Sequence, residues 1–152
     1  MRKMLMLATA AVLLAGAGAA FAAEVEVKML NKGADGGMMV FEPNLVTIAP
    51  GDTVKFISVD KGHNAEVIKG MLPADATPFA GKSSEDISVV FDKPGIYGVK
   101  CAPHYVMGMV AMIVVGTPAN LEEAKAVPQI GKAKQVMSGL FDKLAAAAPA
   151  AK

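Results

Sequence analysis

Cysteine and histidine are scarce in this sequence, whose 152 residues include one Cys and two His. A single Cys cannot close a disulfide within the chain, so Cys101 must serve another purpose. The chain also lacks an excess of charge of either sign, because it has 15 Lys and Arg and 14 Asp and Glu. This near-zero balance argues against a nucleic-acid binder and leaves only local patches for a basic partner surface.

Long apolar runs are missing as well, apart from Met4–Ala20. That run follows Arg2 and Lys3, is too short and too rich in small residues to favour a membrane anchor, and ends in an A-x-A cleavage pattern, Ala20-Phe21-Ala22. We predict that residues 1–22 are a cleaved signal peptide that exports the protein to the periplasm. Residues 23–152 then form a single domain, large enough for one hydrophobic core.

Short segments of alternating apolar and polar residues follow one another from Ala23 to Gly116, separated by turn residues. In the first of them Val25, Val27 and Met29 alternate with Glu26 and Lys28. This pattern predicts an all-β sandwich. The other expected extended segments are Phe41–Ile48, Thr53–Ser58, Ala65–Ile68, Ile87–Phe91, Ile96–Lys100 and Met109–Val115. Because Pro43 interrupts the second segment, we expect it at a sheet edge or bending between sheets.

The hydrophobic period changes after Pro118. Residues 119–148 are rich in helix formers and predict two helices, Asn120–Val127 and Ile130–Ala148, broken at Pro128. The apolar stripe expected to pack on the sandwich comprises Ile130, Ala133, Val136, Met137, Leu140, Phe141 and Leu144.

The chemistry-bearing residues cluster near the end of the strand region. Cys101 ends one predicted strand, His104 and Met109 belong to the loop leading into the last strand, and His63 follows Gly62 at another strand end. Two imidazoles, one thiolate and one long axial thioether form the coordination set of a blue-copper site. Met107 is the alternative axial ligand, but Met109 is favoured because it begins the next strand.

Two other interpretations of Cys101 compete with a metal site. A free Cys is often simply a small buried hydrophobe. A nucleophilic Cys-His pair would need an orienting residue and an oxyanion pocket, and the only evident orienter, Asn64, follows the other histidine. A complete ligand set with no ready open position also argues against metal-assisted hydrolysis.

The residues around these ligands resemble the motifs of the cupredoxins, the family of blue-copper proteins. The resembling segments are Val27–Gly33, Phe41–Pro43, Pro50–Val54, Asp60–Asn64 and Val99–Met109. The resemblance runs from Ala23 to about Leu144 and implies a Greek-key β-sandwich, to which this chain adds two C-terminal α-helices. Plastocyanin and amicyanin, within the same family, end near the last strand.

The resemblance also implies a function. It indicates an electron carrier, not an enzyme, with one type 1 copper ion cycling between Cu(II) and Cu(I) on His63, Cys101, His104 and Met109. Implied partners are redox proteins docking at the His104 face of a monomer: copper nitrite reductase, nitrous oxide reductase, and periplasmic cytochromes or dehydrogenases. The alternative is a periplasmic copper delivery or storage protein, and a metal-free interaction module is a third possibility.

Docking is expected at an apolar patch around His104 formed by Met38, Met39, Pro103 and Met107. Lys32, Lys61 and Lys100 lie next to loops at this end of the sandwich and could steer acidic partners. The stretch Gly36–Met39 is one residue longer than in the family, which leaves open whether Met38 or Met39 packs near the copper.

Two residues next to ligands are candidates for tuning the redox potential. Asn64 could bridge the two ligand-bearing loops by hydrogen bonds, and Pro103 removes a backbone N–H that would otherwise be free to donate to the sulfur. A turn residue and a loop stiffener are the plainer interpretations of the two.

Overall fold

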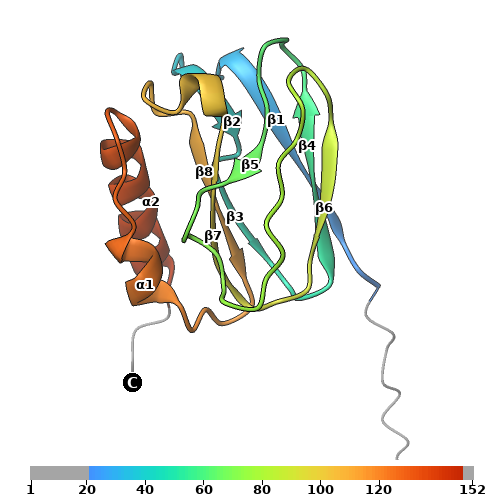
Figure 1. Ribbon diagram of the computed structural model, residues 1–152, viewed down its shortest axis with the longest axis vertical. Coiled ribbons are helices and arrows are strands. Elements are labelled where there is room, and N and C mark those ends of the chain that lie inside the picture. The colour runs from blue at the N-terminus through green and yellow to red at the C-terminus, as the bar shows by residue number, and fades with distance from the viewer. Residues whose placement is uncertain (1–20, 149–152) are drawn as a thin grey trace, which may run out of the picture.

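A sandwich of two four-stranded sheets, with two helices against one outer face, makes up the computed structural model, which describes residues 21–148 (Figure 1). The predicted signal peptide, residues 1–22, lies almost wholly outside the described residues. The strands are β1 (Glu24–Lys32), β2 (Met38–Glu42), β3 (Leu45–Ile48), β4 (Asp52–Ser58), β5 (Glu66–Val67), β6 (Ile87–Phe91), β7 (Gly95–Lys100) and β8 (Val110–Val115). The helices are η1 (Ala102–His104), α1 (Leu121–Ala126) and α2 (Ala133–Ala147).

Both sheets are mixed. The first has the order β2-β1-β4-β6, and the second has the order β3-β8-β7-β5. One pair in each sheet is parallel, namely β1 with β4 and β3 with β8, and the other neighbours are antiparallel. The expected sandwich with two C-terminal helices is therefore confirmed.

The segment around Pro43 passes from one sheet to the other. β2 is an edge strand of the first sheet and β3 is an edge strand of the second. Proline cannot donate to a strand ladder, so an edge or a crossing point is where it is tolerated. We expected Phe41–Ile48 either at a sheet edge or bending between the sheets, and the structure shows both features.

Side-chain alternation in β8 serves two cores at once. Ala111, Ile113 and Val115 pack between the two sheets. Val110, Met112 and Val114 face the helices on the other side. All six residues are buried, and burying each of the Val, Ile and Met side chains among them stabilises the fold by about 1.5–3 kcal/mol. β8 follows the loop from Cys101 to Met109, called the ligand loop below, and is thus fixed on both faces.

The helices begin later than the sequence pattern predicts. α2 starts at Ala133, because Gly131 has a φ of 53°, outside the right-handed helical region. Ile130 was expected in the packing stripe, but it lies in the connector before α2 and is 49% exposed, so that assignment was wrong. Ala133, Met137 and Leu140 are buried as expected. Within residues 21–148, no helix combines the length and apolar character needed to span a membrane.

Candidate metal centre

Three potential ligand atoms meet at one end of the sandwich. His63 lies between β4 and β5, Cys101 follows β7 directly, and His104 ends η1. The Nδ1 atoms of the two histidines are 3.0 Å apart. The Cys101 Sγ lies 3.7 Å from His63 Nδ1 and 3.5 Å from His104 Nδ1. The structure therefore brings together three of the four predicted ligands.

These separations fit a single ion. Metal–nitrogen bonds of about 2.0 Å and metal–sulfur bonds of about 2.3 Å, with near-equal angles between them, separate the ligand atoms by about 3.3–3.8 Å. The observed distances of 3.0, 3.5 and 3.7 Å are close to that range. Two imidazoles and one thiolate in a triangle form the set that blue-copper sites use.

The two candidate axial methionines differ in their surroundings. Met109 is fully buried, and its backbone N–H donates to the His104 carbonyl at 3.2 Å. Its carbonyl accepts the Cys101 N–H at 3.1 Å. Met107 is 47% exposed. The backbone thus ties Met109 to both loop ligands, which is the setting expected of the axial thioether.

Asn31 holds His63, and the sequence analysis did not single it out. The Oδ1 atom of Asn31 lies 2.9 Å from His63 Nε2. An amide oxygen accepts, so this contact places the imidazole proton on Nε2 and leaves the Nδ1 lone pair free for an ion. The Asn31 backbone N–H in turn donates to Asp60 at 2.7 Å. The only sequence signal is a polar residue near the end of a strand, which is too common to be informative.

Burial shifts the pKa of His63 and of Cys101 in the direction that favours the neutral form of each. The pKa of His63 is lowered by desolvation and by the neighbouring His104, against a smaller raising effect of Asp60. The pKa of the Cys101 thiol is raised, chiefly by desolvation, while hydrogen bonds from the Asn64 and His104 backbones favour the thiolate. A neutral His63 imidazole is ready to coordinate, whereas the Cys101 thiol must release its proton when a metal binds.

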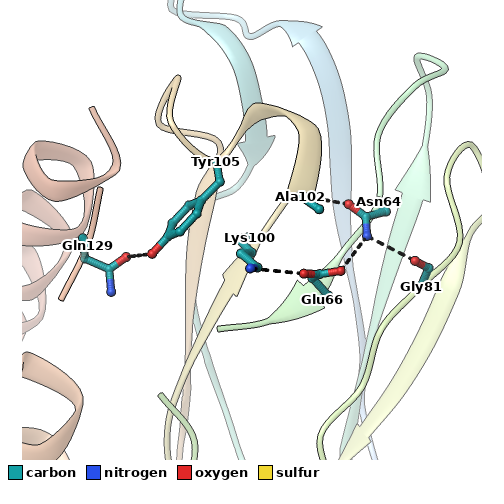
Figure 2. A network of polar contacts seen from close by, with 7 residues as sticks. All are labelled: Asn64, Glu66, Gly81, Lys100, Ala102, Tyr105 and Gln129. Atoms are coloured by element: carbon teal, nitrogen blue, oxygen red, sulfur yellow. Dashed lines mark hydrogen bonds and ion pairs between the residues drawn. The ribbon is translucent and has the colours of Figure 1, made fainter. Parts of the chain in front are cut away.

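Asn64 bridges the two ligand-bearing segments, as the sequence suggested (Figure 2). Its Oδ1 accepts the Ala102 N–H at 2.8 Å, next to Cys101. Its Nδ2 donates to the Gly81 carbonyl at 3.2 Å and to the Glu66 carboxylate at 3.1 Å. With all these contacts made by one buried side chain, Asn64 is more than a turn residue.

Lys100 is engaged in contacts of its own. Its Nζ forms an ion pair with Glu66 at 3.3 Å and lies 5.1 Å from the centre of the Tyr105 ring (Figure 2). Lys61, by contrast, is exposed, and within residues 21–148 its side chain donates only to the Ser84 carbonyl, at 3.3 Å. Of these two lysines, Lys61 is the better placed to meet a partner's charge.

The surface beside His104 is apolar. His104 is half-buried, whereas His63 is fully buried, so one ligand edge alone reaches toward solvent. Met38 is 52% exposed, Val106 is 59% exposed, and Pro103 and Met107 are exposed too. Met39 is half-buried against the core between the sheets. Val106, which precedes Met107 in the same loop, is a further exposed apolar side chain that the sequence analysis did not single out.

The fold and this cluster agree with a comparison against protein families. Residues 27–116 match the model of copper binding proteins of the plastocyanin/azurin family. The chain belongs to this family of blue-copper electron-transfer proteins, whose members carry electrons and do not act as enzymes.

Known relatives narrow the assignment to the pseudoazurins. The chain is 50% identical to the pseudoazurin of Methylorubrum extorquens over 92% of its own length and 95% of that protein. It is 48% identical to the pseudoazurin of Paracoccus pantotrophus, over 86% and 90% of the two chains. The crystal structure of pseudoazurin from Methylobacterium extorquens AM1 superposes with a TM-score of 0.76 at 51% identity, covering 80% of this chain and 98% of the other.

Proposed function

We propose that the protein is a periplasmic single-electron carrier that holds one type 1 copper through His63, Cys101, His104 and Met109. The observation that carries this proposal is the triangle of His63 Nδ1, His104 Nδ1 and Cys101 Sγ, whose sides measure 3.0–3.7 Å. Bound copper would supply a Cu(II)/Cu(I) couple. The protein contributes a buried set of ligands held from two separate parts of the chain.

Rigidity is the chief contribution of the residues around the ion. Asn31 fixes the ring of His63, and Asn64 ties the segment of His63 to that of Cys101. Ligands that cannot move keep one geometry in both oxidation states, which suits fast electron transfer. A copper delivery protein would instead need ligands that exchange readily, and His63 and Cys101 are fully buried.

The His104 face is the proposed docking surface. The exposed apolar side chains around the half-buried imidazole give a partner a dry contact close to the site. Copper nitrite reductase and nitrous oxide reductase are the proposed acceptors, and periplasmic cytochromes or dehydrogenases are the proposed donors. The carrier is expected to work as a monomer, because docking requires this face to be free.

The test is spectroscopic. The protein is produced from the full-length gene with export, and its mass shows whether the chain begins at Ala23. A strong sulfur-to-copper charge-transfer band that bleaches with ascorbate and returns on oxidation is expected. A weak band with rapid loss of copper would indicate delivery or storage instead, and no uptake of copper would indicate a metal-free module. Stopped-flow reduction of the two purified reductases then tests the acceptors.

A further inference from the structure

The connector between α1 and α2, residues 127–132, lies against the middle of the ligand loop. α1 lies at the end of the sandwich away from η1, and the connector leads back to the end that carries η1 (Figure 1). The family match ends at residue 116, so both helices and their connector lie beyond it. In this structure the helices cover the second sheet, and their contacts with the ligand loop are additional to that role.

The first contact joins Tyr105 to Gln129. Tyr105 directly follows His104, and its hydroxyl donates to Gln129 Oε1 at 2.7 Å (Figure 2). The Gln129 Nε2 donates to the Val127 carbonyl at 3.2 Å and to Met71 Sδ at 3.8 Å. Because both of these partners are acceptors, the amide is oriented with its oxygen toward Tyr105. The Gln129 side chain is thus oriented to accept the hydrogen bond from the Tyr105 hydroxyl.

The second contact is a backbone clamp one residue further on. The Lys132 N–H donates to the Val106 carbonyl at 2.9 Å. A side-chain carbon at Gly131 would lie 2.5 Å from that carbonyl oxygen, so only glycine allows so close an approach. Its φ of 53° also favours glycine. The glycine at 131 thus allows the connector to form a direct backbone hydrogen bond with the ligand loop.

We propose that Gln129 is a positioning residue for the metal site, acting through Tyr105 on the loop that carries His104 and Met109. Asn64 holds the start of this loop at Ala102, and the connector holds its middle at Tyr105 and Val106. The proposal rests on the copper site proposed above. It assigns to the C-terminal helices a share in setting ligand geometry.

The chain offers a matched control, because its two tyrosines each donate one hydrogen bond. Tyr105→Phe and Gln129→Leu remove the contact with the connector. Tyr97→Phe removes a similar bond, from the Tyr97 hydroxyl to the Lys93 carbonyl at 2.9 Å, at the opposite end of β7. All three variants should lose a similar amount of stability, so the control separates positioning from general weakening.

Amide hydrogen exchange of the metal-free protein gives a readout that does not depend on copper. The Met107 and Gly108 amides donate to the His104 and Tyr105 carbonyls at 3.0 and 2.9 Å. In Tyr105→Phe and Gln129→Leu their exchange should be about three- to tenfold faster, the factor expected for one lost hydrogen bond. Tyr97→Phe should leave both amides unchanged. Equal effects of Tyr97→Phe and Tyr105→Phe, or no effect of Gln129→Leu, would overturn the proposal.

The copper-loaded variants give the second readout. The sulfur-to-copper band should shift in Tyr105→Phe and Gln129→Leu and stay in place in Tyr97→Phe. Faster exchange of the loop with an unshifted band would overturn the claim that the connector sets ligand geometry. Should none of the proteins bind copper, the proposed function fails, while the exchange data still decide whether the connector holds the loop.

Discussion

The Asn64 side chain accepts the backbone N–H of Ala102 at 2.8 Å and so links the segment between β4 and β5 that carries His63 to the loop that carries Cys101. We expect Asn64→Ala to destabilise the protein by about 1–3 kcal/mol, because it leaves a backbone donor without its partner. The loops should also move relative to each other and shift the charge-transfer band and the reduction potential. Thermal unfolding, the visible spectrum and voltammetry measure the three effects.

Asn120→Ala is the control for that variant. Asn120 makes a similar double contact, accepting the Ile96 N–H at 2.8 Å and donating to the Ile96 carbonyl at 3.0 Å, but at the other end of β7. It should lose comparable stability with an unchanged spectrum. An Asn64→Ala protein with the parent spectrum and potential would show that the bridge does not tune the site.

Met109→Leu and Met107→Leu distinguish the two candidate axial ligands. Both changes nearly conserve volume, so each should cost less than about 1.5 kcal/mol of stability. Loss of a thioether that favours Cu(II) should raise the potential of Met109→Leu by roughly tens of millivolts, since a tenfold change in preference corresponds to about 59 mV. Met107→Leu should keep the parent potential. The reverse result would make Met107 the ligand.

Lys61→Glu tests electrostatic steering. Because Lys61 is exposed at the end of the sandwich near His63, its reversal should slow association with an acidic redox partner by about three- to tenfold at low salt. The dependence of the rate on ionic strength should weaken as well. Lys93→Glu, in the turn before β7 at the opposite end, should leave both quantities unchanged. Stopped-flow rates over a range of salt concentrations measure the effect.

Lys100→Glu should show a second effect besides slower association. The new carboxylate would face Glu66, which now pairs with Lys100 at 3.3 Å. A lower unfolding temperature is therefore expected for this variant and not for Lys61→Glu. Unchanged rates and salt dependence in both variants would contradict steering by these lysines.

Gly98 in β7 lies against the buried Met71 and leaves no room for a side chain. A side-chain carbon there would overlap Met71, so Gly98→Ala should destabilise the protein by about 1–3 kcal/mol through overpacking. Gly139 in α2 has nothing within 4 Å of the same position, and Gly139→Ala should stabilise by about 0.5–1 kcal/mol. Chemical denaturation of the two variants checks both the size and the sign.

The raised pKa of Tyr97 predicts that the stability of the protein depends on pH. Its pKa is raised by burial and by Asp92, against a lowering effect of its hydrogen bond to Lys93. The stability that this group contributes is therefore complete below the pKa of the unfolded chain, about 10, and is lost as pH rises toward the higher folded value. The stability advantage of the parent over Tyr97→Phe should shrink between pH 9 and 11. A constant difference across that range would contradict the assignment.

The convergence of His63, Cys101 and His104 could be predicted because each lies at the end of a strand or in a loop between strands. Strand alternation located the segments, and the loop from Cys101 to Met109 is short enough to act as one unit. The patch at Met38 and Met107 followed from the same placement.

Contacts between distant segments could not be predicted in this way. The role of Asn31 depends on a register that places it beside His63, and the ion pair of Lys100 depends on the pairing of β5 with β7. Helical periodicity extended α2 to Ile130, because the pattern does not reveal that Gly131 adopts a positive φ to approach Val106. Each of these features is fixed by tertiary packing.

The parallel pairs β1–β4 and β3–β8 have a consequence for the order of folding and metal binding. They join residues far apart in the chain, such as Leu45 with Met112, and domains dominated by such pairings fold in milliseconds to seconds. β5, which follows His63, pairs with β7, which Cys101 follows, so these two ligands meet only once this long-range pair has formed. We therefore expect copper to bind a chain that has already folded and to stabilise that folded state by mass action.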